Sequence, residues 1–377
     1  CPLCPLQKQN TMGRFSLRES ILQCSRLTRA AHSNFYPAFS FLSKERCEAM
    51  EILYAYTRFT DDLVDMPEVD PVTGNSLAIS PRRKRQKLNQ WSAAVEAVLG
   101  KVDGTGIEVG SADDSVAFEK LYERFQSCTG FVLLPALKMI VDKFQIPVHP
   151  FFHLIDGVDA DIEVRRFGTF DDVSDYCHQV ATSVGFASLA IWGTVKPLFS
   201  DEVVRAAKAS GVAFQLTNIL RDVVADFKDG RLYFPIDEIT RFGLTENQFG
   251  MLLDRKTWNA EKYNNDDKNN ENNKQNDYML SERLGQMKKL EDKFTQVLNK
   301  QFERCDIYYT NSAQLYQLIN PQCRKVFGMM WSRYHEIFKI MQNKPELILR
   351  KRRVSLSMLR KLRLYLRWKL LPCFRLN

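Results

Sequence analysis

Long apolar runs are missing from this sequence. Across its 377 residues, no uninterrupted apolar stretch reaches the roughly 18 residues that a membrane-spanning helix needs. The most apolar region, residues 131–155, is interrupted by Lys138, Asp142, Lys143 and several prolines. It therefore predicts a core helix, a turn and a second helix. No secretory signal is visible. The sequence gives no indication of a chain that crosses a membrane.

Paired cysteine motifs are also scarce. The nine cysteines are scattered, and Cys1 and Cys4 form a Cys-x-x-Cys without a second pair, so a zinc site is not predicted. Most other cysteines have apolar, helical surroundings, in which free Cys acts as a small hydrophobic residue. We therefore expect a reducing, cytoplasmic compartment. The chain opens on Cys rather than Met, and we expect residues 1–13 to be a disordered end or an artefact of the assigned start.

Two short acidic clusters carry most of the functional information. Asp61 and Asp65 are four residues apart in a segment with helical apolar spacing. Asp222 and Asp226 have the same separation in a second such segment. At this spacing both carboxylates of a pair project from one helical face, where they repel each other unless a cation lies between them. The clusters predict two helices that face each other across a cleft and bind Mg²⁺ with a diphosphate.

Polar stripes extend both clusters along their helices. Tyr54 and Arg58 precede the first pair at helical spacing, and Gly211, Gln215 and Asn218 precede the second. The second stripe lies between apolar residues, and unpaired buried polar groups cost about 1–3 kcal/mol each. A single Asp-x-x-x-Asp is more often a solvated helix face. Two of them, each continued by polar residues, favour a metal–diphosphate site.

The segment after the second cluster adds a cation. Gly230 and Pro235 end the helix, and the loop between them brings Arg231 close to the carboxylates. The arginine guanidinium binds phosphate oxygens with two parallel hydrogen bonds.

Four segments together carry a family resemblance. They are Tyr-Ala-Tyr-Thr-Arg-Phe-Thr-Asp-Asp-Leu-Val-Asp (54–65), Asp-Tyr-Cys-His-Gln-Val-Ala-Thr-Ser-Val-Gly (175–185), Gln-Leu-Thr-Asn-Ile-Leu-Arg-Asp-Val-Val-Ala-Asp (215–226) and Gly-Arg-Leu-Tyr-Phe-Pro (230–235). The chain resembles the squalene/phytoene synthases, which condense two prenyl diphosphates head to head, from about His32 to about Arg353. The resemblance implies an all-α, single-domain helical bundle around a central substrate cavity.

The resemblance also implies roles for individual residues. Asp61, Asp65, Asn218, Asp222 and Asp226 would bind Mg²⁺, with Mn²⁺ as an alternative, and Arg58 and Tyr176 would join the aspartates in catalysis. Asp161 would support the cavity from behind. NADPH is implied only if squalene is the product; no Gly-x-Gly-x-x-Gly motif is present, and this fold does not require one. The implied substrate-binding residues are Phe35, Tyr54, Gly211, Gln215, Asn218, Arg221, Arg231, Tyr233, Tyr334 and Arg352.

Departures from the family pattern keep two alternatives open. Ala225 stands where the family often has glutamate, and His32, Asn34 and Gln179 also differ. One alternative is a cyclising terpene synthase that uses a single prenyl diphosphate, but segments 175–185 and 230–235 favour two substrates. The other is a non-catalytic assembly factor with the same fold. All four outer aspartates are present, which favours an enzyme.

Basic residues are concentrated at the C-terminal end, and the net charge is +8. Nine lysines and arginines lie between Arg350 and Lys369, and Leu359, Leu362, Leu366 and Leu370 repeat at helical spacing. We expect 350–377 to form a basic amphipathic tail. It could lie on the inner face of a membrane as a peripheral contact, or pack on the domain through its leucines. Nucleic acid is the weakest alternative, because no recognition fold accompanies the charge, and we expect no such partner.

The remaining organisation follows from periodicity and composition. We expect one helical domain over 14–349, interrupted by a disordered Asn-rich insertion at 264–277. Pro67, Pro71, Gly74 and Pro81 predict a loop over 66–81. Two helices are expected within 14–65, and further ones near 82–99, 115–128, 130–143, 150–165, 171–194, 201–227, 246–258, 279–310, 312–319 and 321–342.

Overall fold

The computed structural model describes residues 16–31, 33–69, 76–100, 115–163, 166–253, 273–349 and 353–370. Over these residues the protein is an all-α bundle, as predicted, with one small antiparallel hairpin of β1 (Glu68–Val69) and β2 (Ser76–Leu77). No described helix combines the length and the apolar character that a bilayer span requires. Residues 264–272 of the Asn-rich segment lie outside the described residues, and 273–277 are helical.

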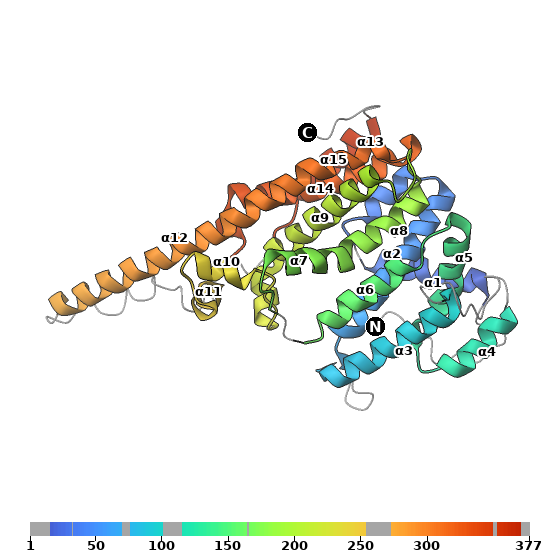
Figure 1. Ribbon diagram of the computed structural model, residues 1–377, viewed down its shortest axis with the longest axis horizontal. Coiled ribbons are helices and arrows are strands. Elements are labelled where there is room, and N and C mark those ends of the chain that lie inside the picture. The colour runs from blue at the N-terminus through green and yellow to red at the C-terminus, as the bar shows by residue number, and fades with distance from the viewer. Residues whose placement is uncertain are drawn as a thin grey trace.

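Helices follow one another along the whole described chain (Figure 1). The N-terminal part contains α1 (Leu17–Ala30), η2 (Tyr36–Phe41), α2 (Lys44–Asp65), α3 (Pro81–Leu99), α4 (Ser115–Phe125), η3 (Thr129–Leu133), α5 (Leu134–Phe144) and α6 (His149–Ala160). The middle contains α7 (Phe170–Cys177), η4 (His178–Thr182), α8 (Ser183–Trp192), α9 (Asp201–Lys228), α10 (Ile236–Arg241) and α11 (Glu246–Leu253). The C-terminal part contains α12 (Asn273–Ser312), α13 (Leu315–Leu318), η6 (Pro321–Cys323), α14 (Arg324–Asn343), η7 (Pro345–Leu347) and α15 (Met358–Leu370).

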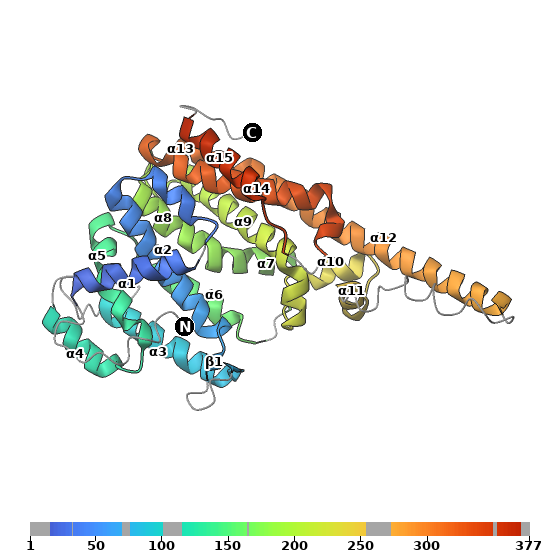
Figure 2. The ribbon, with the colours of Figure 1, turned by 180° about the vertical axis from the view of Figure 1, so that it is seen from behind.

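Helix α9 lies in the middle of the bundle, where it contacts α7, α8, α11, α12, α13 and α14. Its apolar residues Val212, Ala213 and Leu220 are fully buried. Helix α12 packs along α9 and then continues beyond the body of the molecule (Figures 1 and 2). A helix that is apolar on most sides can only be stable when neighbours surround it, and this places the second aspartate cluster on a central, well-supported rod.

Local sequence determines where the helices that carry site residues begin. The Ser43 hydroxyl accepts a hydrogen bond from the backbone N–H of Arg46 and so caps α2. Thr169 and Asp172 form a reciprocal capping box at the start of α7. Acidic Asp201 and Glu202 lie in the first turn of α9, where they interact favourably with the helix dipole.

The structure corrects several predicted boundaries. The expected loop 66–81 contains the β1–β2 hairpin, and the expected helices 115–128 and 150–165 end earlier, at Phe125 and Ala160. The expected continuous helix 171–194 is divided by the π-helical turn η4 between α7 and α8. A π turn holds one extra residue, and such turns often occur at functional sites. Here the turn packs closely against α9.

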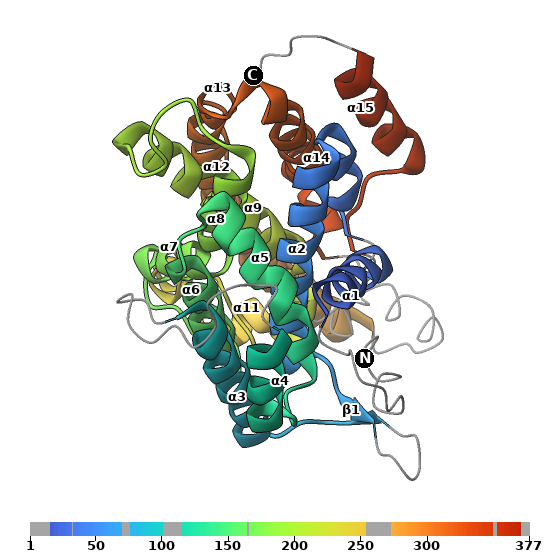
Figure 3. The same cartoon turned by 90° about the vertical axis from the view of Figure 1, so that its right-hand side faces the viewer.

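The C-terminal helix α15 packs against α14 and η2 at the edge of the molecule (Figure 3). Leu364 and Trp368 form its buried side. The predicted leucine stripe of Leu359, Leu362, Leu366 and Leu370 is exposed instead. The tail therefore does pack on the domain, as one alternative expected, but through Leu356, Leu364 and Trp368 and not through the repeat that begins at Leu359.

Candidate active site

A cavity of about 460 Å³ lies between α2, η4, α8, α9 and α14. Its volume falls within the range of small-molecule sites. Arg353 also lines it, together with Asn34. The cavity brings together nine residues that the sequence predicted for the site: Phe35, Tyr54, Arg58, Asp61, Gly211, Gln215, Asn218, Arg221 and Tyr334.

The lining of the cavity changes from apolar to polar along α2 and α9. On α2, Met50 and Leu53 precede Arg58 and Asp61. On α9, Ala207 and Phe214 come before Gln215, Asn218 and Arg221 in the same direction. Apolar walls are thus followed by carboxylates, amides and guanidinium groups toward the C-terminal ends of both helices. A molecule with a long apolar chain and an anionic head matches this gradient.

Arg231 joins the C-terminal ends of the two helices. Its Nη1 lies 3.4 Å from Oδ1 of Asp65 at the end of α2. Its Nη2 lies 3.5 Å from Oδ1 of Asp226 on α9 and 3.4 Å from Oδ2 of Asp229. The backbone N–H of Arg231 also donates to the carbonyl of Asp226, which fixes the turn after the helix. One guanidinium therefore lies between the outer carboxylates of both clusters, and the clusters face each other as the sequence predicted.

Two aspartates carry strongly perturbed pKa values. Burial, and repulsion from Asp65, raise the pKa of Asp61 to about 8 despite the nearby Arg58 guanidinium. Burial also raises the pKa of Asp226 to about 7, although Arg231 opposes the shift. Without another cation nearby, each of these two carboxylates keeps its proton to a higher pH than usual, because the charged form is disfavoured. Strongly perturbed carboxylates mark functional sites, and Asp61 lines the cavity.

Asp222 differs because two arginines already neutralise it. Arg221 donates from Nε and Nη2 to the two carboxylate oxygens at 2.9 and 2.7 Å. Arg353 donates from Nε to Oδ1 at 2.7 Å and from Nη2 to Oδ2. Burial would raise the pKa of Asp222, but hydrogen bonds from these two arginines hold it below its usual range.

Sequence analysis missed Arg353 and assigned the neighbouring Arg352, which lies outside the described residues. The run of basic residues at 350–353 was the available signal, but which member reaches the cavity depends on the path of the chain after η7.

Arg58 pairs with an aspartate that is not one of the predicted metal ligands. Its Nη2 forms an ion pair with Oδ1 of Asp62, one helical turn along α2. Arg58 is therefore aligned by Asp62 and lines the cavity beside Asp61. An arginine that is already fixed in place binds an incoming anion with a smaller loss of side-chain entropy.

The donor groups fit a hard divalent cation. Buried Asn218 Oδ1 has no hydrogen-bond partner, while its Nδ2 donates to Gln215 Oε1 at 3.2 Å. An orphaned amide oxygen that lines the same cavity as the Asp61 carboxylate is a ligand of the type that Mg²⁺ and Mn²⁺ prefer. Within the described part of the chain, no three Asp, Glu, His or Cys side chains converge on one point. The Arg231 guanidinium lies between Asp65 and Asp226, and Arg221 and Arg353 bind both oxygens of Asp222.

The squalene/phytoene synthase family model matches residues 28–261, more than half of the chain. The chain belongs to the squalene/phytoene synthase family. Phytoene synthase 1, chloroplastic, from Zea mays is 30% identical over 248 residues, which are 65% of this chain and 52% of that protein. Phytoene synthase from Arthrospira platensis is 28% identical over 232 residues, 59% of this chain and 63% of that protein. The match thus spans about half to two thirds of the length of these curated relatives.

Solved structures share the fold of this family member. A dehydrosqualene synthase in complex with ligand aligns with a TM-score of 0.61 at 22% identity, covering 94% of this chain and 96% of that one. Squalene synthase HpnC from Alicyclobacillus acidocaldarius aligns with a TM-score of 0.58 at 19% identity, covering 89% and 99%. At these identities the likeness concerns the all-α fold, which agrees with the fold that the sequence predicted.

In this squalene/phytoene synthase family member, Tyr176 and Tyr233 share one carboxylate. The Tyr176 hydroxyl donates to Asp161 Oδ2 at 2.6 Å, and that of Tyr233 donates to Oδ1 at 2.9 Å. The two rings stack with centroids 5.1 Å apart, against Phe167. Burial raises the pKa of Asp161, and the two hydroxyl donors oppose that shift. The predicted supporting role of Asp161 therefore takes the form of a hydrogen-bonded hub for two predicted site residues.

Replacing Tyr176 with Phe should reduce the free energy of unfolding by about 1–3 kcal/mol, because a buried carboxylate loses one of its donors. Urea unfolding measures the change. Tyr233→Phe should have a similar effect, and the double variant should lose more than the sum, since Asp161 is then left with neither donor. Tyr365→Phe on α15 serves as a matched control. Strictly additive losses would show that the two hydroxyls do not act through a common carboxylate.

Gly211 allows α9 to contact the π turn. A Cβ at this position would lie 2.2 Å from Thr182 Oγ1 and 2.8 Å from its backbone N and Cα. Thr182 is fixed in turn by His178, whose Nδ1 lies 3.0 Å from the Thr182 hydroxyl. The predicted site residue Gly211 therefore acts through close backbone packing.

Gly211→Ala should destabilise the protein by about 1–3 kcal/mol, because neither helix can move without displacing its neighbours. The thermal unfolding midpoint measures this effect. The control is Gly285→Ala on α12, where an added Cβ meets nothing within 4 Å. That variant should be neutral or more stable by up to about 1 kcal/mol. Equal midpoints for the two variants would contradict the packing role.

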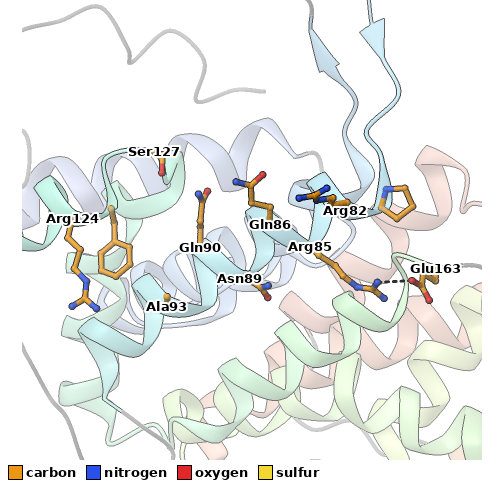
Figure 4. Close-up of a pocket in the computed structure, with 11 residues that line it drawn as sticks. Arg82, Arg85, Gln86, Asn89, Gln90, Ala93, Arg124, Ser127 and Glu163 are labelled. Atoms are coloured by element: carbon orange, nitrogen blue, oxygen red, sulfur yellow. Dashed lines mark hydrogen bonds and ion pairs between the residues drawn. The ribbon is translucent and has the colours of Figure 1, made fainter.

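A second hollow, the polar groove, lies outside the predicted site. Its volume is about 890 Å³, and it is lined by the outer face of α3 and by the end of α4 (Figure 4). Arg82, Gln86 and Gln90 extend from α3, and Arg85 forms an ion pair with Glu163 at 2.7 Å. Six of its eleven lining residues carry an amide or a guanidinium group, and two of the others are Ser127 and Glu163, so it suits a long hydrocarbon chain poorly. The smaller cavity beside Asp61 is the better substrate site.

Proposed function

We propose that this protein condenses two prenyl diphosphates head to head, through a cyclopropyl intermediate. The observation that carries the proposal is the position of Arg231 between Asp65 and Asp226. These residues lie at the C-terminal ends of α2 and α9, the direction in which the lining of the apolar cavity becomes polar. A site with carboxylates and arginines at one end and hydrocarbon walls at the other suits an alkyl chain with a diphosphate head. Membership of the squalene/phytoene synthase family supports the two-substrate reaction.

The diphosphate group would bind at the C-terminal ends of α2 and α9. Held there by Asp61, Asp65, Asn218, Asp222 and Asp226, Mg²⁺ or Mn²⁺ would supply Lewis-acid stabilisation of the departing diphosphate. Arg58 and Arg231 would bind its oxygens through charge-assisted hydrogen bonds. The C–O bond breaks with its electrons on the diphosphate, which leaves an allylic carbocation on the first chain.

The apolar wall of the cavity would protect that cation. Phe35 stacks on Tyr334 with centroids 4.9 Å apart, and Phe214 lies 5.1 Å from Tyr334. Aromatic faces stabilise cations, and a dry wall excludes the water that would quench one. The double bond of the second prenyl diphosphate then forms the new C–C bond, and loss of a proton closes the cyclopropane. Tyr176, fixed by Asp161, would receive or direct that proton.

Substrate length and the fate of the intermediate are the finer parts of the proposal. Farnesyl (C15) and geranylgeranyl (C20) diphosphates differ by five carbons, worth about 4 kcal/mol if fully buried, so a given cavity should prefer one of them. The curated relatives are named phytoene synthases, which favours the C20 donor and phytoene. Squalene or presqualene diphosphate would result from C15 donors, with NADPH required for squalene.

We also propose a reducing, cytoplasmic location, which the free buried thiols of Cys24, Cys177 and Cys305 support.

Incubation of the purified protein with Mg²⁺ and labelled C15 or C20 diphosphate, with and without NADPH, tests the proposal. A C30 or C40 product, or a cyclopropyl diphosphate, is the expected result. A cyclic C15 or C20 hydrocarbon would indicate a cyclising terpene synthase instead. No turnover of either substrate by folded protein with either metal would favour a non-catalytic assembly factor.

A further inference from the structure

Helix α15 is fixed on the domain through one face. The side chains of Leu364 and Trp368 are only 3% and 2% exposed. The Trp368 indole N–H donates to Ser332 Oγ on α14 at 3.2 Å. Its ring also covers Gly328 so closely that a Cβ there would lie 2.1 Å from Cη2. These contacts determine which side of α15 faces outward.

The opposite face of α15 is an exposed apolar ridge. Leu359 and Leu370 are 79% and 73% exposed, and Leu362 and Leu366 are 52% and 42% exposed. Spacings of three, four and four residues align these side chains along the helix, directly away from Leu364 and Trp368. Figure 3 shows α15 at the periphery of the molecule, near α14. We call these four leucines the leucine ridge.

The leucine ridge is unusual among the surfaces that the structure describes. Thirteen large apolar side chains are strongly exposed over the described ranges, and the ridge together with Met358 contributes five of them within one helix. The other eight are distributed along the described chain, from Leu22 on α1 to Ile307 on α12. Single exposed apolar residues need no explanation, but a contiguous row marks an interaction surface.

Basic residues flank the leucine ridge on both sides. At 100° per residue, Lys369 lies beside the ridge on one side, and Arg363 and Arg367 lie on the other. Glu336 of α14 is the acidic group that interacts with these arginines. The helix itself contains no acidic residue. Its five basic residues are Arg360, Lys361, Arg363, Arg367 and Lys369.

We propose that α15 is a docking surface for an anionic lipid membrane. The helix would lie in the plane of the interface, with the leucine ridge at the acyl boundary and the cations among the headgroups. A second copy of the chain fits less well, because its own basic flanks would repel those of the first. The ridge is also convex, whereas a bilayer needs no complementary groove.

Docking would bring the membrane close to the predicted active site. Arg353 binds Asp222 and lines the cavity, and only a short segment, 354–357, separates it from the start of α15. A hydrocarbon product would then leave the cavity near a bilayer into which it can partition. The proposal does not depend on the proposed reaction, since membrane binding requires neither substrate nor metal.

Vesicle flotation with the purified full chain, in the absence of prenyl diphosphate, tests the proposal. We expect binding to phosphatidylcholine vesicles that contain phosphatidylglycerol, weaker binding to phosphatidylcholine alone, and weaker binding at high salt. The variant L359S/L362S/L366S/L370S should reduce the partition coefficient at least about tenfold. The matched control L22S/L77S/V195S/I307S, which removes four exposed apolar side chains elsewhere, should bind like the parent.

Two further measurements make the result decisive. Circular dichroism and thermal unfolding should be unchanged in the ridge variant, because the altered side chains do not contribute to the core. Light scattering should give the same molecular mass for parent and ridge variant. Equal vesicle binding by both proteins, or no binding by the parent, would overturn the proposal. A parent dimer that becomes monomeric in the ridge variant would identify the ridge as a subunit interface and would also overturn it.

Discussion

Asp61→Asn should reduce the release of diphosphate from a prenyl diphosphate by at least about a thousandfold, because it removes a carboxylate that would bind the metal. The same variant should make the metal-free protein more stable at pH 8. The pKa of Asp61 is raised to about 8, so the folded state binds a proton that the unfolded state releases at much lower pH. Stability is therefore lost as the pH rises from about 4 toward 8. Asparagine removes this loss.

At pH 8 we expect Asp61→Asn to raise the free energy of unfolding by about 1–3 kcal/mol. This is at the low end of what the raised pKa would allow, because the Asp61 side chain is partly accessible to the cavity. Urea unfolding without metal and a continuous assay of released diphosphate measure the two effects. Asp292→Asn, at an exposed position of α12, is the control and should change neither. Loss of both activity and stability would instead show that Asp61 supports the fold.

Asp222→Asn gives an informative contrast. Its pKa is lowered because Arg221 and Arg353 hold the charged form, so its contribution to stability is present above the unfolded pKa and lost on acidification. The Asp222→Asn variant should therefore be less stable than the parent protein. It should also lose diphosphate release, because it removes a predicted metal ligand. Opposite stability changes at Asp61 and Asp222 would distinguish the carboxylate that burial keeps protonated from the one that arginines keep charged.

Arg231→Met is the second substitution with a large expected effect. It removes the cation between Asp65 and Asp226 and one candidate ligand of the leaving diphosphate. We expect turnover to fall about 10²–10³-fold. The metal-free protein should unfold at lower temperature at pH 8, because the two carboxylates then face each other unpaired.

Addition of Mg²⁺ should restore much of the lost thermal stability of Arg231→Met and change the parent less, since the ion would replace the missing positive charge. Thermal unfolding with and without Mg²⁺ measures this difference. Arg241→Met breaks an exposed ion pair with Asp237 and is the control, with little effect expected. An unchanged midpoint for Arg231→Met at every Mg²⁺ concentration would mean that the two clusters do not share a cation site.

The sequence predicted the main features of the cavity for a clear physical reason. Helical periodicity places Tyr54, Arg58 and Asp61 on one side of α2, and it does the same for Gln215 and Asn218 on α9. Polar side chains on an otherwise buried helix must meet polar partners, so their stripe marks the site before any fold is known. Periodicity and composition similarly predicted most helix starts to within a few residues.

Contacts between distant segments were not predictable in this way. The pairing of Arg353 with Asp222 joins segments that are far apart in the chain. The contact between Gly211 and Thr182 depends on the π turn. Periodicity describes one helix at a time and does not specify which neighbour a side chain meets. The same limit applied to α15, where the leucine repeat gave the correct helix but not the face that packs.

The order of residues along each helix determined by itself that this chain is an all-α protein with two aspartate clusters and a basic C-terminal helix. Side-chain periodicity is a local property, and local backbone geometry is enough to express it. Tertiary structure decided which carboxylates lack a counter-charge, which arginine reaches Asp222 and which side of α15 faces outward. Those properties depend on burial and on distances between segments, which arise only when the helices pack together.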